Sequence, residues 1–250
     1  MYSYREYVMK NSVHAYNPHV SVDCVVFGFD GEKLKVLLIE RTIEEQNFSD
    51  KKLPGSIIFE DEDLDEAAVR ILNELTGLKN IYLSQFHSFG NPHRTKNMRD
   101  KNWLEKLTNM KIGRIVTVGY VALIKISRKI IFESENTAAN WYDVSSLKSF
   151  QLAFDHNEIA DTALEHIRHK VKSEPSMLFE LLPQKFTMTQ LRNLYDTIMG
   201  TTSDVRNFKK KIMQIEGLEQ LDEVQKDVPY RAPRLYRFDK KVHKKSTRKL

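Results

Sequence analysis

The stretch LPGSIIFEDEDLDEAAVRILNELTGL, residues 53–78, decides how the first half of the chain folds. Residues 63–77 within it predict an amphipathic helix, because apolar side chains recur there at helical spacing: Leu64, Ala67, Ala68, Ile71, Leu72 and Leu75. Gly77 is a natural stop for that helix. The stretch therefore predicts a helix with one apolar face, which needs a sheet or another helix to cover it.

Two strands are predicted before this helix. The segment HVSVDCVVFGFDGEKLKVLLIERT, residues 19–42, holds two apolar runs around a turn at Asp30 and Gly31. The first run is apolar on both faces, so we expect a strand at the centre of a sheet. Asp23 lies within that run, where a charged group needs a partner or a ligand. A hydrogen-bonded buried carboxylate and a pocket residue both fit this position.

The elements predicted after the helix are two strands at residues 81–89 and 113–126, a turn after residues 141–147, and an amphipathic helix over residues 152–172. The polar and basic segment between those strands, residues 90–112, contains Trp103 and Leu104, which suggest a short helix. It is longer than a plain connecting loop. We therefore expect it to cover a site or a partner.

This order of elements resembles the Nudix family, whose fold is an α/β/α sandwich around a mixed sheet. The family's box reads Gly, five residues, Glu, seven residues, Arg-Glu-apolar, one residue, Glu-Glu, one residue, Gly-apolar. After the lead-in of residues 53–55, the matching residues are Glu62, Arg70, Leu72, Glu74, Gly77 and Leu78. The chain departs from the box at Ser56, Ile71 and Leu75, where the family has Gly, Glu and Glu.

The two missing glutamates determine the chemistry expected of the helix. Positions 71, 74 and 75 are spaced i, i+3 and i+4, so they share one helix face. Three carboxylates there would hold hard cations such as Mg²⁺, which would orient a water and neutralise a pyrophosphate during its cleavage. Only Glu74 remains, while Ile71 and Leu75 suit packing onto a sheet. We therefore expect no catalytic residue, no metal, no cofactor and no hydrolase activity.

An alternative keeps a metal site by using other carboxylates near the box. The candidates for this are Glu60, Asp61 and Glu62. Glu62 itself fits a structural or capping role better than that of a metal ligand. The alternative would make the chain an active hydrolase.

Composition bounds the class of protein. A chain of 250 residues suits one large or two modest domains, and 41% hydrophobic residues are enough to build cores. The single cysteine, Cys24, leaves no internal disulfide. The N-terminus lacks a signal pattern, and no run approaches the roughly 18 apolar residues of a membrane helix. We expect a cytoplasmic protein without a membrane partner.

Basic residues are concentrated in the last third of the chain. Residues 170–250 contain 18 Lys and Arg against 10 Asp and Glu, a net charge of +8, while the remainder has a net charge of −3. Such an asymmetry suggests a polyanionic partner for the basic part. A solvated basic tail explains the charge equally well.

The last third also has the element order of a winged helix-turn-helix domain. A short apolar helix at residues 176–183 precedes helices over 186–200 and 201–215, and two short extended pieces follow that could form a hairpin. In the third helix we expect one face to point inward and the other outward. The inward residues are Val205, Phe208, Ile212 and Ile215.

The third helix of such a domain enters the DNA major groove, where Arg and Asn read guanine and adenine. We expect DNA contacts from three parts of the domain. The helix caps are Thr187, Thr189 and Ser203, and the outward face of the third helix carries Arg206, Asn207, Lys210 and Lys211. The wing contributes Arg231, Arg234 and Arg237. The basic tail, residues 240–249, would add a salt-dependent attraction. A small helical protein-binding domain with a solvated basic face is the alternative.

We expect two domains, a Nudix-like sensor domain over residues 1–172 and a winged-helix domain over residues 173–250. This combination resembles the Nudix-related transcriptional regulators, the NrtR-like and AraR-like group. The segments HSFGNPHR, LAFDHNEIADTAL and FTMTQLRNLYDTIMG carry this resemblance beyond the box. It implies a homodimer that binds palindromic double-stranded DNA, most often as a repressor. A small effector in the former substrate pocket would release the DNA by favouring one arrangement of the dimer.

The effector is the finer part of this expectation. NrtR-like members sense ADP-ribose compounds and govern NAD metabolism, whereas AraR-like members sense arabinose. Because the metal cluster is lost and the 90–112 segment is long, we expect a carbohydrate, L-arabinose by resemblance. An ADP-ribose sensor and an active ADP-ribose hydrolase with a DNA-binding domain are the alternatives. The expected effector-binding residues are Asp23, Arg41, Glu60, His87 and Tyr142, with His156 fixing the junction by hydrogen bonds.

Overall fold

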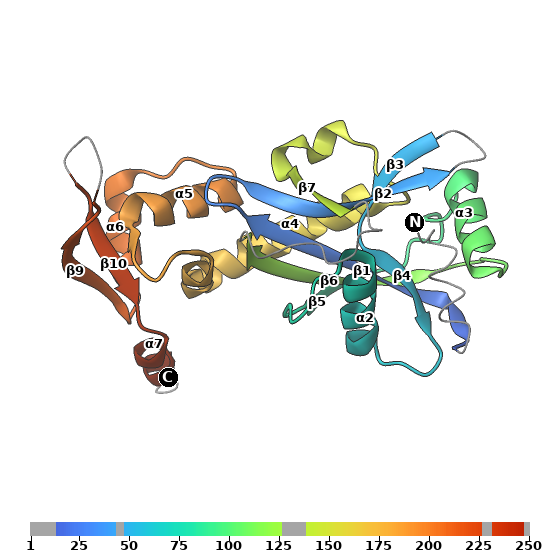
Figure 1. Cartoon of the computed structure of the whole chain (residues 1–250), viewed down its shortest axis with the longest axis horizontal. Coiled ribbons are helices and arrows are strands. Elements are labelled where there is room, and N and C mark those ends of the chain that lie inside the picture. Colours follow the sequence, from blue (N-terminus) through green and yellow to red (C-terminus); the bar gives the residue numbers. More distant parts are fainter. Residues whose placement is uncertain (1–13, 44–47, 127–138, 227–231, 248–250) are drawn as a thin grey trace. The chain divides into compact units, whose positions relative to one another are not determined.

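A computed structural model describes residues 14–43, 48–126, 139–226 and 232–247 of the chain (Figure 1). The described residues form two compact units. The first contains most of residues 14–166, and the second contains residues 167–247 together with the short segments 29–34 and 124–126. The sequence-based domain limits of 1–172 and 173–250 stay a prediction. No helix among the described residues is long and apolar enough to span a membrane.

A seven-stranded sheet forms the centre of the first unit, with strand order β3-β2-β1-β6-β5, β4 paired with β1 and β7 paired with β2. Its strands are β1 (Tyr16–Phe29), β2 (Leu34–Ile43), β3 (Phe48–Lys52), β4 (Gly55–Phe59), β5 (Ser84–Phe89), β6 (Val116–Lys125) and β7 (Ala139–Asp143). The prediction of a central first strand is confirmed, because β1 lies between β2 and β6 and is buried from Val22 to Phe29. The short strands β3, β4 and β7 were not predicted.

Helix α2 (Leu64–Thr76) agrees with its prediction at both ends. Asp63 caps the start by accepting from the Asp65 amide, while the Glu66 side chain accepts from the Asp63 amide in a capping box. Gly77 ends the helix in the left-handed conformation, with φ of 72°. Ile71 and Leu75 are 0% and 4% exposed, so the residues that replace the box glutamates pack the helix onto the protein core.

The segment between β5 and β6 contains helix α3 (Met98–Thr108), as expected, with Asn97 as its N-cap. It packs beside β4 through a cluster in which Leu104, Ile112 and Ile115 meet Ile57. After β7, the 3₁₀ helix η2 (Val144–Ser149) leads to helix α4 (His156–Ser173), which confirms the helix predicted over residues 152–172 and starts four residues later. The long polar segment is therefore an ordered part of the first unit.

The second unit contains a helix-turn-helix and a three-stranded sheet with order β8-β10-β9. Its elements are η3 (Pro175–Leu181), β8 (Phe186–Thr187), α5 (Met188–Met199), α6 (Val205–Ile212), β9 (Leu218–Val224), β10 (Arg234–Phe238) and α7 (Lys240–Thr247). Helix α5 follows a capping box of Thr187 and Gln190 and ends at Gly200 with φ of 66°. The predicted hairpin is β9 and β10, while β8 and α7 were not predicted.

One inward-facing prediction in α6 is wrong. Phe208 and Ile212 are buried, and the Phe208 ring lies 5.3 Å from that of Tyr195 on α5. Val205 is 56% exposed and Ile215 is half-buried. A helix of two turns that packs through its middle leaves its first residue beyond the contact, so helical spacing alone does not bury Val205.

We expect Gly55→Ala to destabilise the first unit by about 1–3 kcal/mol, because it overpacks a filled core. A Cβ at Gly55 would lie 1.7 Å from Asp23 Oδ1 and 3.0 Å from the Val22 carbonyl oxygen. Gly113→Ala is the matched control, since its Cβ would meet nothing within 4 Å. Urea unfolding measures both variants, and equal midpoints would contradict the prediction.

Candidate functional site

The surviving box residues form a closed ion-pair cluster. The Arg70 guanidinium bonds to Glu62, donates to Glu74 at 3.0 Å, and lies 3.9 Å above the Phe59 ring. Glu62 also accepts from the Phe59 amide at 2.8 Å, which is the structural role expected of it. Both carboxylates that match the box are thus engaged by one arginine.

A Mg²⁺ pair does not fit this arrangement. Among the described residues, no group of three or more His, Cys, Asp and Glu side chains is placed to hold a metal. The alternative donors do not rebuild a site, because Glu60 is exposed after β4 and Asp61 lies 3.0 Å from His14 Nδ1. We therefore derive no step that passes through a metal.

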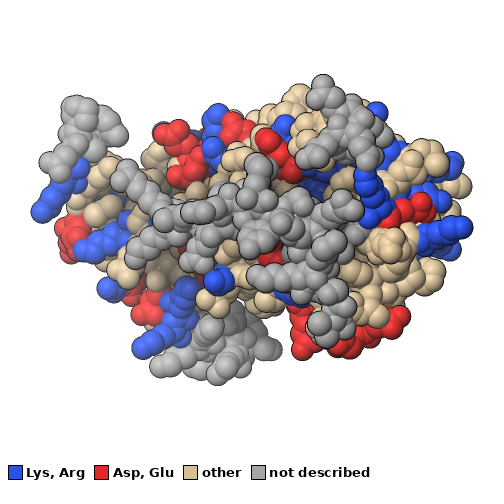
Figure 2. Space-filling view, turned by 45° about the vertical axis from the view of Figure 1, so that its right-hand side comes forward, with Lys and Arg blue, Asp and Glu red and all other residues tan. Residues whose placement is uncertain are grey.

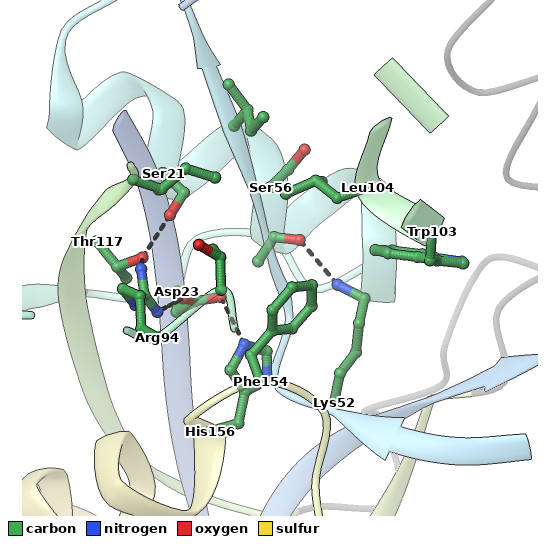
Figure 3. A pocket seen from close by; sticks show the side chains of 14 residues that line it. Ser21, Asp23, Lys52, Ser56, Arg94, Trp103, Leu104, Thr117, Phe154 and His156 are labelled. Atoms are coloured by element: carbon green, nitrogen blue, oxygen red, sulfur yellow. Dashed lines mark hydrogen bonds and ion pairs between the residues drawn. The ribbon is translucent and has the colours of Figure 1, made fainter. Parts of the chain in front are cut away.

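A small buried cavity of about 40 Å³ lies among β1, β4, β6 and α3. The side chains that give it its polar character are Asp23, Lys52, Arg94, Thr117 and His156, and Phe154 and Trp103 supply apolar walls (Figure 3). Pockets for small organic ligands span about 300–1,000 Å³, whereas one water needs only about 10–15 Å³ of such space. In this conformation the cavity has room for a few waters and not for a sugar or a nucleotide.

The Asp23 carboxyl group lines this cavity, and its pKa is raised from the ordinary value. It is 5% exposed, and burial raises its pKa to about 6, against the opposing charges of Arg94 and Lys52. Arg94 Nη2 lies 3.8 Å from Asp23 Oδ2, and His156 Nε2 lies 3.5 Å from Asp23 Oδ1 (Figure 3). The Asp23 carboxylate therefore has partners within the fold, and it also lines a cavity.

The two basic residues of the cavity are held firmly. Arg94 forms a two-pronged pair with Asp155, at 2.9 Å from Nε and 2.7 Å from Nη2. Lys52 Nζ donates to the Gly55 carbonyl at 2.8 Å, and burial lowers its pKa to about 8. Neither residue was predicted to belong to a site, since a single Arg in a polar segment and a Lys at a strand end carry no local signal of burial.

His156 joins the cavity to the box lead-in. Its Nδ1 accepts a hydrogen bond from the Leu53 amide at 2.9 Å, so the proton of the neutral ring lies on Nε2, facing Asp23. Burial, followed by the charge of Lys52, lowers the pKa of His156 to about 3. The ring fixes the segment before α4 by hydrogen bonds, in keeping with the role expected from the sequence.

Of the five predicted effector residues, only Asp23 lines this cavity. Arg41 is buried and bound by Asp50 and Asp100, at 2.7 Å and 2.6 Å. The other three lie elsewhere on the surface of the unit. Glu60 and His87 are exposed, and half-buried Tyr142 donates to Glu40 at 3.0 Å. The structure does not gather the five into one site.

The outer face of α6 is polar and basic. Its exposed residues are Arg206, Asn207, Lys209, Lys210 and Lys211. Asp204 caps the helix by accepting from the Asn207 amide at 2.9 Å, so the Asn207 side chain stands at the start of the helix. Lys209 was missed by the sequence reasoning, although it lies in the same basic run. This face has the residue types that read and hold DNA.

The remaining predicted DNA-binding residues are spread over different environments. Thr187 is buried, and its hydroxyl accepts from the Gln190 amide inside the fold, while Thr189 is exposed and Ser203 is half-buried. Arg234 and Arg237 are exposed on β10, where they face Asp222 at 3.7 Å and Glu219 at 3.0 Å on β9. Arg231 lies outside the described residues.

The comparisons with known proteins agree with this architecture. Residues 17–163 match the model of the NUDIX domain, and residues 178–238 match that of the NrtR DNA-binding winged helix domain. The crystal structure of Shewanella oneidensis NrtR complexed with a 27mer DNA is 24% identical with a TM-score of 0.64, covering 90% of this chain and 95% of that one. The expected fold class, a Nudix sandwich with a mixed sheet followed by a winged helix-turn-helix domain, is thereby confirmed.

The family follows from the sequence matches. The "ADPR responsive transcriptional repressor NtrR" of Acinetobacter baylyi is 30% identical over 229 residues, which cover 89% of this chain and 82% of the relative. A MutT/nudix family protein from Enterococcus faecalis shares the fold, with 24% identity, a TM-score of 0.61, and coverage of 96% of this chain and 94% of that one. The chain belongs to the Nudix-related, NrtR-like family of transcriptional regulators. None of these matches supports the arabinose-responsive, AraR-type expectation.

We predict that His156 stays neutral with its proton on Nε2 from pH 7.5 down to pH 5. Because its folded-state pKa of about 3 lies below the ordinary 6.5, the neutral ring contributes stability above pH 6.5 that is lost as the pH falls toward 3. Long-range ¹H–¹⁵N NMR spectra of the imidazole nitrogens measure both the tautomer and the titration. A midpoint near 6.5 would contradict the burial argument.

Proposed function

We propose that this chain is a transcriptional repressor that binds double-stranded DNA as a homodimer and releases it when its Nudix domain binds ADP-ribose. The observation that carries the proposal is the relative from Acinetobacter baylyi, whose 30% identity extends over 229 residues and so includes both units. Its name states both properties, repression and a response to ADPR. ADP-ribose, the alternative of the sequence analysis, takes the place of the expected sugar.

The DNA-binding part of the proposal is supported by α6. An α-helix fits the major groove, and residues at its start reach base edges in helix-turn-helix domains. Arg206 and Asn207 are exposed at this position, and Lys209, Lys210 and Lys211 follow on the same helix. Arg and Asn would read bases while the lysines meet phosphates, whose contacts depend on salt.

We also propose that the Nudix domain binds its ligand without hydrolysing it. Ile71 and Leu75 occupy two carboxylate positions of the box, where they are buried and offer no oxygen ligand to an ion. The remaining box carboxylates, Glu62 and Glu74, are bound by Arg70. Binding without hydrolysis distinguishes a regulator from the second candidate function, a hydrolase with a DNA-binding domain.

We expect Arg206→Ala and Asn207→Ala each to weaken specific DNA binding by about 1–3 kcal/mol, as the loss of a base contact does. Mobility-shift titrations with fragments of the genome that encodes this chain would identify the bound sequence and measure the loss. Equal weakening on random DNA would instead assign both residues to phosphates. Light scattering is expected to find two chains in the complex.

The same assay tests the effector. ADP-ribose added to the wild-type complex is expected to release the DNA, whereas arabinose at the same concentration is expected to leave it bound. Release by arabinose alone would restore the sugar interpretation. The absence of any preferred DNA sequence would favour the protein-binding alternative.

We expect no formation of AMP and ribose 5-phosphate when the protein is incubated with ADP-ribose and Mg²⁺, because the two remaining box carboxylates, Glu62 and Glu74, are both bound by Arg70 and are a poor site for a hard cation. Chromatography of the nucleotides would measure this. Turnover that Glu74→Gln abolishes would show an active hydrolase and overturn this part of the proposal. Turnover that the variant retains would point to a contaminating enzyme.

A further inference from the structure

A second hollow on the first unit is large enough for a nucleotide. This groove, with a volume of about 460 Å³, is bordered by β3, by the start of α3 and by residues 149–153. Its volume lies within the range of about 300–1,000 Å³ that small-molecule sites occupy, whereas the cavity at Asp23, with about 40 Å³, does not. Size therefore favours the groove over the cavity as the place where a whole effector binds.

Two cations border the groove, and aromatic rings hold them in place. Lys51 Nζ lies 5.2 Å from the centre of the Tyr142 ring and 5.1 Å from that of Phe150, and the Arg99 guanidinium lies 3.8 Å from that of Phe48. Contact with a ring face orients a cation without neutralising its charge. Among the described residues neither cation forms an ion pair, so both positive charges can face an anion.

The acids of the groove are already paired. Asp50 and Asp100 line it, but both bind the Arg41 side chain, which is only 2% exposed, through Nε at 2.7 Å and Nη2 at 2.6 Å. Among the described residues of the groove and their buried partner Arg41, one arginine and two carboxylates leave a single negative charge, against the two positive charges of Lys51 and Arg99. Helix α3 starts at the groove with its N-cap Asn97, so its positive dipole end adds to this balance.

The charge on the box side of the unit has the opposite sign. The acidic run of residues 60–66 leaves most of its side chains exposed. Figure 2 shows Asp and Glu gathered along the lower right edge of the view, with Lys and Arg above them. Without a metal, such an acidic edge repels a diphosphate. The groove is thus favoured by both its charge and its size.

We propose that this groove binds the diphosphate of the effector, with Lys51 and Arg99 in contact with phosphate oxygens beside the start of α3. The proposal rests on the proposed function, in which ADP-ribose is the effector. It gives the long segment between β5 and β6 a role, since that segment supplies Arg99 and Asn97 to one wall of the groove. Arg41 then acts as a positioning residue that holds the two acidic residues of the groove.

Isothermal titration of the full chain with ADP-ribose tests this site. Lys51→Ala and Arg99→Ala are each expected to raise Kd by about tenfold or more, as the loss of a charge-assisted hydrogen bond does. Lys106→Ala, on the same helix as Arg99, and Lys148→Ala, near residues 149–153, remove the same charge from exposed positions outside the groove lining. These two controls are expected to keep the wild-type Kd within about threefold, because water and salt screen the interaction between an exposed charge outside the groove and a ligand inside it.

Further ligands identify the part of the effector that is recognised. ADP is expected to bind and to lose affinity in the same two variants, whereas adenosine and ribose are expected to be insensitive to them. Arg99→Lys, which keeps the charge, is expected to recover part of the affinity. Thermal unfolding of each variant verifies that the fold is intact.

Two failures of the experiment have different meanings. Wild-type binding that Lys51→Ala and Arg99→Ala leave unchanged would overturn the groove and leave the proposed function in place. The absence of any ADP-ribose binding by the wild-type chain would overturn the effector part of the proposed function, and the groove proposal with it. A loss of affinity as large in the control variants would show a general effect of net charge and would also overturn the site.

Discussion

The packing of α2 onto the sheet is the constraint on which the first unit depends. Ile71 and Leu75 contribute to it from positions where the Nudix box has glutamates, and each fully buried side chain of this kind contributes about 1.5–3 kcal/mol. Charged carboxylates at these positions would have to leave the interior or be compensated by ions. The same two residues thus stabilise the helix and leave two of the three clustered carboxylate positions of the box without an oxygen ligand. Arg70 binds the two remaining box carboxylates, Glu62 and Glu74, so its positive charge partly balances them without a metal ion.

A second set of interactions connects the parts of the unit that surround the Asp23 cavity. Arg94 reaches from the segment after β5 to Asp155, and His156 reaches from the start of α4 to the Leu53 amide. Buried ion pairs of this kind add little net stability, but the removal of one partner leaves an uncompensated charge. Their effect is to fix the position of one segment relative to another. Asp100 extends the connection to the groove, since it binds Arg41 and accepts from the Phe154 amide at 3.0 Å.

The loss of a metal site does not by itself remove a diphosphate from the possible ligands. A sugar is expected only if a pyrophosphate needs a chelated cation, but lysine, arginine and a helix N-terminus also bind phosphates. Lys51, Arg99 and the start of α3 are such a set, in which Lys51 comes just before the box lead-in and the other two come from the segment between β5 and β6. A change in the box from acid to apolar residues is therefore compatible with a change from catalysis to recognition of the same kind of molecule.

Local patterns in the sequence predicted α2 with its Gly77 end, the central strand β1 and the helix-turn-helix with its hairpin, because spacing, caps and turns act between near neighbours. The short strands β3, β4, β7 and β8 were missed, because a strand of five or two residues is too short to show a clear alternation of apolar and polar side chains. The candidate site depended even more on tertiary structure. Arg41 was expected in a pocket and is instead bound by Asp100, 59 residues away, while Lys51 meets Tyr142 and Phe150, which are 91 and 99 residues away. Whether a charged side chain faces a ligand or an internal partner is decided by residues that only the folded chain brings together.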